Sequence, residues 1–138
     1  MFEVTGLSIE RRPNRERTDF WITEVMWDST RGCLEPLTEV YDNETEFIIR
    51  IDMPCVRRKS DIKVHLTEDT VSIEAQMNRV IQYERWGTFQ REAKFFRYTK
   101  TFTLPAKIDP ESSKARFKDG VLELRLPKKE RRFTISIE

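Results

Sequence analysis

The sequence FTLPAKIDPESSKARFKDGVLELRLPKKERRFTISIE (residues 102–138) decides the fold of this chain. Within it, residues 121–126 alternate apolar and polar side chains, which is typical of a strand with one buried face. Asp119 and Gly120 supply turn chemistry just before this run, and Pro127 cannot continue a strand ladder after it. The stretch therefore predicts short strands separated by sharp turns.

The segment 129–138, which we call the tail, has a pattern of its own. A charged spacer opens it, and Phe133, Ile135 and Ile137 then share one side of an extended run. Two isoleucines on such a run need another surface to cover them, so we predict that Ile135 and Ile137 bind a second copy of the chain. The alternative is that the run is the last strand of its own domain, but the charged spacer favours assembly.

Alternation with a period of two recurs throughout residues 37–128. Turn residues such as Asp42-Asn43 and Glu68-Asp69 separate the runs. We predict an all-β chain, with an immunoglobulin-like antiparallel β-sandwich over residues 37–128, an N-terminal arm at 1–36 and an extended tail at 129–138. The inward-facing residues of four runs are Phe47, Ile49 and Ile51; Ile62, Val64 and Leu66; Val71 and Ile73; and Leu122, Leu124 and Leu126.

Length and charge limit the functions open to the chain. Its 138 residues suffice for one domain with a sizeable core. The net charge of +1 is too balanced to predict nucleic acid or a membrane as the main partner. The sequence shows no membrane-spanning apolar run and no signal-peptide pattern, so we expect a cytoplasmic location. Cys33 and Cys55 lack a disulfide pattern, which also favours a reducing compartment.

The N-terminal arm is rich in aromatic and apolar side chains around residues 20–27. Thr18 or Asp19 is a suitable cap for a short helix, in which Ile22, Val25 and Met26 would share a face. We therefore predict a partly helical arm. Because Phe20, Trp21 and Trp27 extend around the rest of such a helix, it would need cover from another surface.

Residues 77–94 interrupt the alternation with a polar stretch. A structureless loop of this length is uncommon in a compact domain and is usually functional. We predict that it forms a dimer contact, with its Val80-Ile81 pair adding to the partner's sheet edge near residues 37–41. The apolar residues of this dimer loop are Val80, Ile81, Tyr83, Trp86 and Phe89.

Several motifs, taken in order, resemble the small heat-shock proteins, whose core is the α-crystallin domain. The resemblance covers residues 37–138, and the order of the motifs is more specific than any one of them. The tail run Ile135-Ser136-Ile137 resembles the family's Ile-x-Ile motif. The other matching motifs are Leu104-Pro105, Ile108-Asp109, the stretch from Ala115 to Asp119-Gly120-Val121-Leu122, and Pro127-Lys128.

The resemblance implies an ATP-independent holdase, a chaperone that binds partly unfolded client proteins and suppresses their aggregation. It implies a dimer built into a larger homo-oligomer, with no catalytic residue, metal or cofactor. The groove that accepts the tail would lie between the runs Ile62, Val64, Leu66 and Leu122, Leu124, Leu126; the alternative is that these six residues are ordinary core. We expect clients to bind the arm, or the arm to pack inside the oligomer, through Phe2, Phe20, Trp21, Ile22, Val25, Met26 and Trp27.

The chain departs from the family pattern at two positions. Cys55 stands where the family has glycine, so its turn must avoid a positive φ or bear strain. Lys100 replaces an arginine, and lysine lacks the planar fork that pairs two oxygens at once.

Two other classes of function compete with the holdase. A nucleic-acid-binding β-module would use the basic clusters at 11–17, 57–59 and 128–132, with Trp86 and Phe89 for stacking. A co-chaperone sandwich would lack an oligomerising tail. An enzyme is disfavoured because His65 is the sole histidine and the sequence shows no phosphate loop, zinc-ligand spacing or nucleophile elbow.

Overall fold

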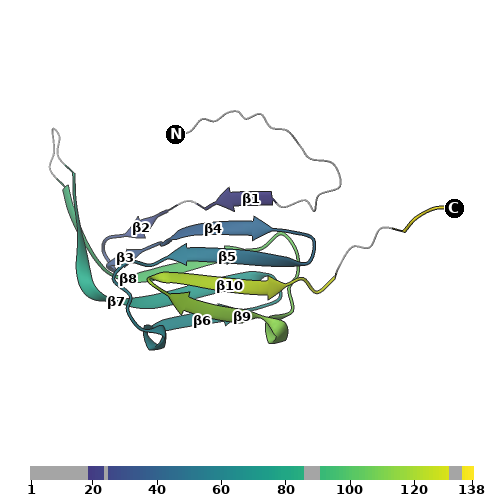
Figure 1. Cartoon of the computed structure of the whole chain (residues 1–138). Helices are drawn as coiled ribbons and strands as arrows, with labels where there is room; N and C mark the ends of the chain where they lie inside the picture. Colours follow the sequence, from purple (N-terminus) through teal and green to yellow (C-terminus); the bar gives the residue numbers. More distant parts are fainter. Residues whose placement is uncertain (1–18, 24, 86–90, 131–134) are drawn as a thin grey trace.

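Two five-stranded sheets packed face to face make up the domain (Figure 1). The computed structural model describes residues 19–23, 25–85, 91–130 and 135–138, with the backbone alone at 83–85 and 91–92. Neighbouring strands run antiparallel in both sheets, apart from one short parallel pair between β3 and β8. The predicted β-sandwich is therefore confirmed.

The strand order places the first and last described strands, β1 and β10, in the same sheet. The first sheet runs β1 (Asp19–Ile22), β4 (Leu37–Asp42), β5 (Glu46–Asp52), β10 (Val121–Pro127) and β9 (Lys114–Lys118). The second sheet runs β2 (Trp27–Asp28), β3 (Cys33–Leu34), β8 (Arg91–Thr103), β7 (Thr70–Arg85) and β6 (Ile62–Leu66). The helices of the described residues are two 3-10 turns, η1 (Lys59–Asp61) and η2 (Pro110–Ser112), and none is long and apolar enough to cross a membrane.

The core lies between the sheets and follows the period-two pattern. Strand β5 contributes Phe47, Ile49 and Ile51, and each is fully buried. Strand β10, next to β5 in the first sheet, adds Leu122, Leu124 and Leu126, and strand β7 of the second sheet adds Val71 and Ile73, all of them buried. Strand β6 contributes less, because it lies at a sheet edge where Ile62, Val64 and Leu66 are only partly buried.

The predicted helix in the arm is wrong for the described residues. Residues 19–22 form β1, which pairs with β4, and residues 27–28 form β2, which pairs with β3. Trp21 lies opposite Val40 and packs against the core, an arrangement that suits aromatic side chains on a sheet. Strands β1 to β3 thus join both sheets before residue 37.

The stretch 77–94 is also not the structureless loop that we predicted. Strands β7 and β8 form one long hairpin, paired from Thr70 and Thr103 out to Arg85 and Arg91, with a register shift between Gln76 and Ile81. In Figure 1 this hairpin extends beyond the end of the sandwich. Ile81 pairs with Phe95 of the same chain, so this part of the predicted dimer loop already has a partner strand in its own sheet.

The turn after β5 has a strained residue. Cys55 has a φ of +75°, in the left-handed region that glycine favours, as the replacement of the family's glycine suggested. The turn is held in place because Tyr98 donates a hydrogen bond of 2.9 Å to the Pro54 carbonyl and the Asn78 amide donates one of 2.6 Å to the Cys55 carbonyl. Both Cys33 and Cys55 are free thiols.

Candidate functional site

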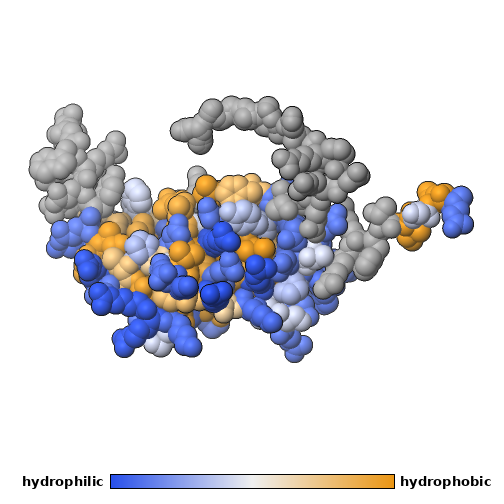
Figure 2. Space-filling view, viewed as in Figure 1, coloured by the Kyte–Doolittle hydropathy of each residue, from blue (hydrophilic) through white to orange (hydrophobic). Residues whose placement is uncertain are grey.

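Exposed apolar side chains gather where both sheets end at strands from the predicted arm. Strands β1 and β2 are the edges of the two sheets on this side of the sandwich, and Figure 2 shows hydrophobic surface over them. Each side chain of the group is 41–58% exposed, so a large share of its apolar surface faces water. We call this group the arm-edge patch; its members are Phe20, Ile22, Val25, Met26, Trp27 and Leu37.

Cross-strand contacts hold the arm-edge patch in place. Phe20 lies opposite Tyr41 on β4, with ring centroids 4.8 Å apart. Ile22 lies opposite Glu39, which places it diagonally from Leu37 on the same face. Of the predicted client-binding residues, the patch thus includes all except Trp21, which packs against the core, and Phe2, which lies outside the described residues.

The hairpin of β2 and β3 is docked on β8 by a close backbone approach at Gly32. The Gly32 carbonyl accepts hydrogen bonds from the Phe96 and Arg97 amides, at 3.0 and 3.3 Å. Gly32 has a φ of +68°, and a Cβ built there would lie 2.0 Å from the Phe96 ring. Lys100 adds an ion pair of 3.4 Å to Glu35 just after β3. Sequence reasoning missed this contact, although a lone glycine among polar residues was a signal for it.

On the opposite side of the sandwich the sheets end at β6 and β9 (Figure 1). Four apolar side chains here pack against the core on one side and are partly exposed on the other. They are Ile62, Val64 and Leu66 of β6 and Phe117 of β9. We call this side the β6–β9 edge. It combines unpaired strand edges with partly exposed apolar side chains.

The second half of the predicted groove is not on this surface. Leu122, Leu124 and Leu126 are 3%, 1% and 0% exposed, so they are core residues and offer no surface to a tail. The reason is the position of β10, which lies between β5 and β9 and is not a sheet edge. Alternation alone identified their inward face but not the place of their strand in the sheet.

The end of the tail is exposed. Ile135 and Ile137 are 82% and 96% exposed, and residues 135–138 pair with no strand of the described chain. The two isoleucines therefore find no cover within the described part of their own domain, as the assembly prediction requires.

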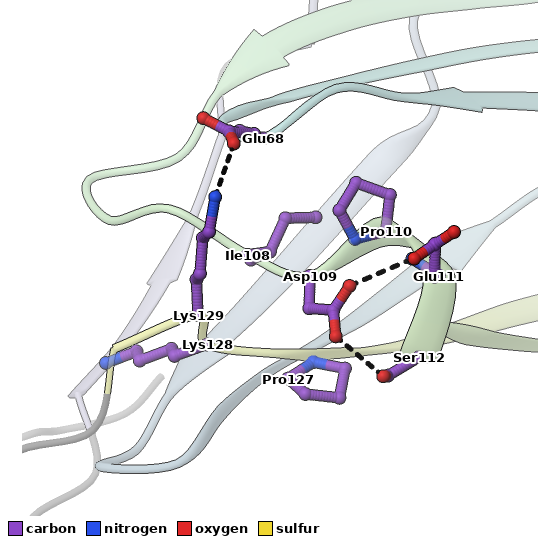
Figure 3. A pocket seen from close by; sticks show the side chains of 9 residues that line it. All are labelled: Glu68, Ile108, Asp109, Pro110, Glu111, Ser112, Pro127, Lys128 and Lys129. Atoms are coloured by element: carbon purple, nitrogen blue, oxygen red, sulfur yellow. Dashed lines mark hydrogen bonds and ion pairs between the residues drawn. The ribbon is translucent and has the colours of Figure 1, made fainter.

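The tail begins at a cluster of charges beside a cavity of about 630 Å³ (Figure 3). Lys129 lies 2.7 Å from Glu68, which also binds Lys107 at 3.2 Å. Hydrogen bonds from Lys129 and then Lys107 lower the pKa of Glu68, and Glu68 in turn raises the pKa of Lys129. Beside them, Asp109 caps η2 by accepting from the Glu111 amide and the Ser112 hydroxyl. Sequence analysis identified only a charged spacer here and none of these ion pairs.

The remaining predicted residues are spread over the molecule. Val80 is half exposed on the β7–β8 hairpin, and Ile81 packs partly against the core. The side chains of Tyr83, Trp86 and Phe89 lie outside the described residues. His65 is exposed on β6, and the described residues contain no group of three or more His, Cys, Asp or Glu side chains arranged to hold a metal ion.

These features define a β-sandwich with apolar side chains exposed at two opposite edges and at the end of the tail. The model of the Hsp20/alpha crystallin family matches residues 39–138, which is most of the chain. The chain therefore belongs to this family of small heat-shock proteins.

Relatives and solved structures agree with this assignment. Spore protein SP21 of Stigmatella aurantiaca is 36% identical over 94 residues, which are 68% of this chain and 55% of that protein. Heat shock protein 16 of Schizosaccharomyces pombe is 30% identical over 102 residues, 72% of this chain and 71% of that one. The solved heat shock protein 16.0 of S. pombe has a TM-score of 0.54 and 29% identity, and the match covers 76% of this chain and 99% of that one. The chain thus spans just over half the length of the first of these relatives.

Proposed function

We propose that this protein is an ATP-independent holdase, which binds partly unfolded proteins through exposed apolar surface and delays their aggregation. The observation that carries the proposal is the arm-edge patch, which keeps six large apolar side chains 41–58% exposed on a folded domain. Exposed apolar groups of this size mark interaction sites. A partly unfolded client offers the same kind of surface, and covering both removes apolar area from water.

We also propose that the protein works as an oligomer. Ile135 and Ile137 would bind the β6–β9 edge of a neighbouring subunit, where Ile62, Val64, Leu66 and Phe117 are partly exposed. Burying the two isoleucines would contribute roughly 1.5–3 kcal/mol each before ordering costs. One tail is therefore weak and reversible, whereas many tails in one assembly gain from effective concentration.

We further propose that the projecting β7–β8 hairpin forms the dimer contact. Val80, which is half exposed, lies within the register shift of this hairpin.

We also propose a cytoplasmic location, because a reducing compartment suits the two free thiols.

Substitutions in the arm-edge patch test the holdase proposal. The double variant Ile22→Ser/Met26→Ser removes two exposed patch side chains that are not part of the buried core. In a light-scattering assay of a heat-labile enzyme, we expect this variant to need severalfold more protein than wild type for equal protection. ATP should change neither protein, because the sequence has no phosphate loop.

A matched control uses Glu44→Ser/Arg57→Ser, two exposed side chains in the turns before and after β5, away from both the arm-edge patch and the β6–β9 edge. This control should protect as well as wild type, with an unchanged β-sheet spectrum. If the patch variant protects as well as wild type, clients do not bind the arm-edge patch. If wild type gives no protection, the protein is not a holdase.

A further inference from the structure

Two consecutive lysines hold the root of the tail to both sheets. Strand β10 ends at Pro127, and the next two side chains point to opposite sides, as successive residues of an extended chain do. Lys128 lies 2.6 Å from Asp42 at the end of β4, in the first sheet. Lys129 lies 2.7 Å from Glu68 in the turn between β6 and β7, in the second sheet (Figure 3).

Backbone hydrogen bonds hold the same two residues from both sides. The Lys128 amide donates to the Thr45 carbonyl, and the Lys129 amide donates to the Lys107 carbonyl, each at 2.9 Å. The Asp109 amide donates to the Pro127 carbonyl, also at 2.9 Å. The chain is thus fixed as far as residue 129, the first residue of the tail.

The two ion pairs differ in their exposure to water. The side chains of Lys128 and Asp42 are 15% and 20% exposed, and the Lys128 ammonium also lies 4.8 Å from the centre of the Phe47 ring. The side chains of Lys129 and Glu68 are 56% and 46% exposed. An exposed pair contributes little to the stability of a fold, so changes at Lys129 and Glu68 should leave the sandwich folded.

The short reach of the tail makes the direction in which it leaves the domain important. Residues 130–135 span at most about 20 Å when fully extended, which is less than the width of a small domain. A tail this short can bind only a neighbour that lies on the side toward which the chain leaves the domain. The direction fixed at residues 128 and 129 would therefore select where a neighbouring subunit can sit.

We propose that Lys128 and Lys129, held by Asp42 and Glu68, are positioning residues that set the direction in which the tail leaves the sandwich and thereby fix a single assembly size. This inference rests on the proposed function, because it needs the tail to link subunits. Loss of one pair would leave the tail attached and able to bind but would let it leave in more than one direction. The number of subunits per assembly would then vary.

A charge exchange tests the proposal at the more exposed pair. Lys129→Glu places two carboxylates together and should change one narrow assembly mass into a broad distribution, measured by native mass spectrometry at low salt. Glu68→Lys should do the same by repulsion among lysines. The double variant Lys129→Glu/Glu68→Lys restores an opposite-charge pair and should restore the single narrow mass. Lys59→Glu, an exposed charge change on η1, serves as the control and should leave the mass distribution unchanged.

Two outcomes separate this inference from the proposed function. If Ile135→Ala/Ile137→Ala leaves the assembly intact, the tail does not link subunits, and both proposals about the tail are wrong. If that variant dissociates the assembly while Lys129→Glu and Glu68→Lys keep one narrow mass, the tail links subunits but its root does not set their arrangement. A broad distribution that persists in the charge-exchanged double variant would also contradict the inference.

Discussion

At the scale of single residues, Cys55 holds a turn in a conformation that its side chain disfavours. Its φ of +75° costs a residue with a Cβ about 1–2 kcal/mol relative to glycine. The surrounding contacts from Tyr98 and Asn78 impose this conformation, since both bind carbonyls of the turn.

Glycine at position 55 should therefore stabilise the protein. We expect Cys55→Gly to raise the free energy of unfolding by about 0.5–1 kcal/mol, because part of the relief is offset by the greater freedom of glycine in the unfolded chain. Urea unfolding under reducing conditions measures the change. Cys55→Val, with a branched side chain at a positive φ, should be destabilised in the same experiment. If Cys55→Gly is destabilised instead, the Cys55 thiol makes a contact that stabilises the fold by more than the backbone strain costs.

Tyr98 gives a prediction that depends on pH. Burial, followed by the nearby Cys55 and Asp52, raises the pKa of Tyr98 to about 12. A tyrosine in the unfolded chain has a pKa of about 10, so Tyr98 stabilises the fold fully below pH 10 and loses that contribution as the pH rises through 12. Tyr98→Phe lacks this titration and also lacks the hydrogen bond to Pro54.

At pH 8 we expect Tyr98→Phe to be less stable than wild type by about 0.5–1.5 kcal/mol, because the partly buried hydrogen bond to the Pro54 carbonyl is lost. The difference should shrink between pH 10 and 12, since only wild type loses a tyrosine contribution there. Unfolding curves measured for both proteins from pH 8 to 12 test this. Two curves that stay parallel would show that Tyr98 does not titrate with the fold.

At the scale of elements, the β2–β3 hairpin covers the edge of β8 and carries part of the arm-edge patch. Its docking depends on Gly32, whose missing Cβ leaves room for the Phe96 ring. The hairpin is otherwise short, with two residues in each strand, so few other backbone bonds hold it. We regard it as the least stable part of the second sheet.

Gly32→Ala should release this hairpin. The left-handed φ alone costs alanine about 1–2 kcal/mol, and the clash with Phe96 adds to it. Hydrogen exchange should show faster exchange of the Phe96 and Arg97 amides, which donate to Gly32, while the Ile49 and Ile51 amides of β5 stay protected. Adding Phe96→Ala should restore part of the protection. Unchanged exchange in Gly32→Ala would mean that the hairpin does not depend on this close approach.

The sequence predicted strands well where apolar and polar residues alternate. It predicted them poorly where the structure of a segment depends on which strand it pairs with. Phe47, Ile49 and Ile51 alternate and are core residues, as expected. The arm became β1 and β2 because an open sheet edge offered pairing, which local helix signals cannot reveal. Alternation also cannot distinguish β6 at a sheet edge from β10 inside a sheet, so it did not reveal that Leu122, Leu124 and Leu126 are buried.

At the scale of the whole molecule, the sandwich separates two surfaces. The arm-edge patch lies where β1 and β2 end the sheets, and the β6–β9 edge lies on the opposite side. A subunit could therefore bind a client on one side while a neighbour's tail occupies the other. Binding of a tail at the β6–β9 edge would bury Ile135 and Ile137, which are exposed in the single subunit.

If tails join subunits into a chaperone assembly, the mass of the protein in solution should show it. Size-exclusion chromatography with light scattering should give a large assembly for wild type. Ile135→Ala/Ile137→Ala should give dimers with an unchanged β-sheet spectrum, because the tail is not part of the described sheets. A monomeric wild type, or a double variant that stays fully assembled, would contradict the account.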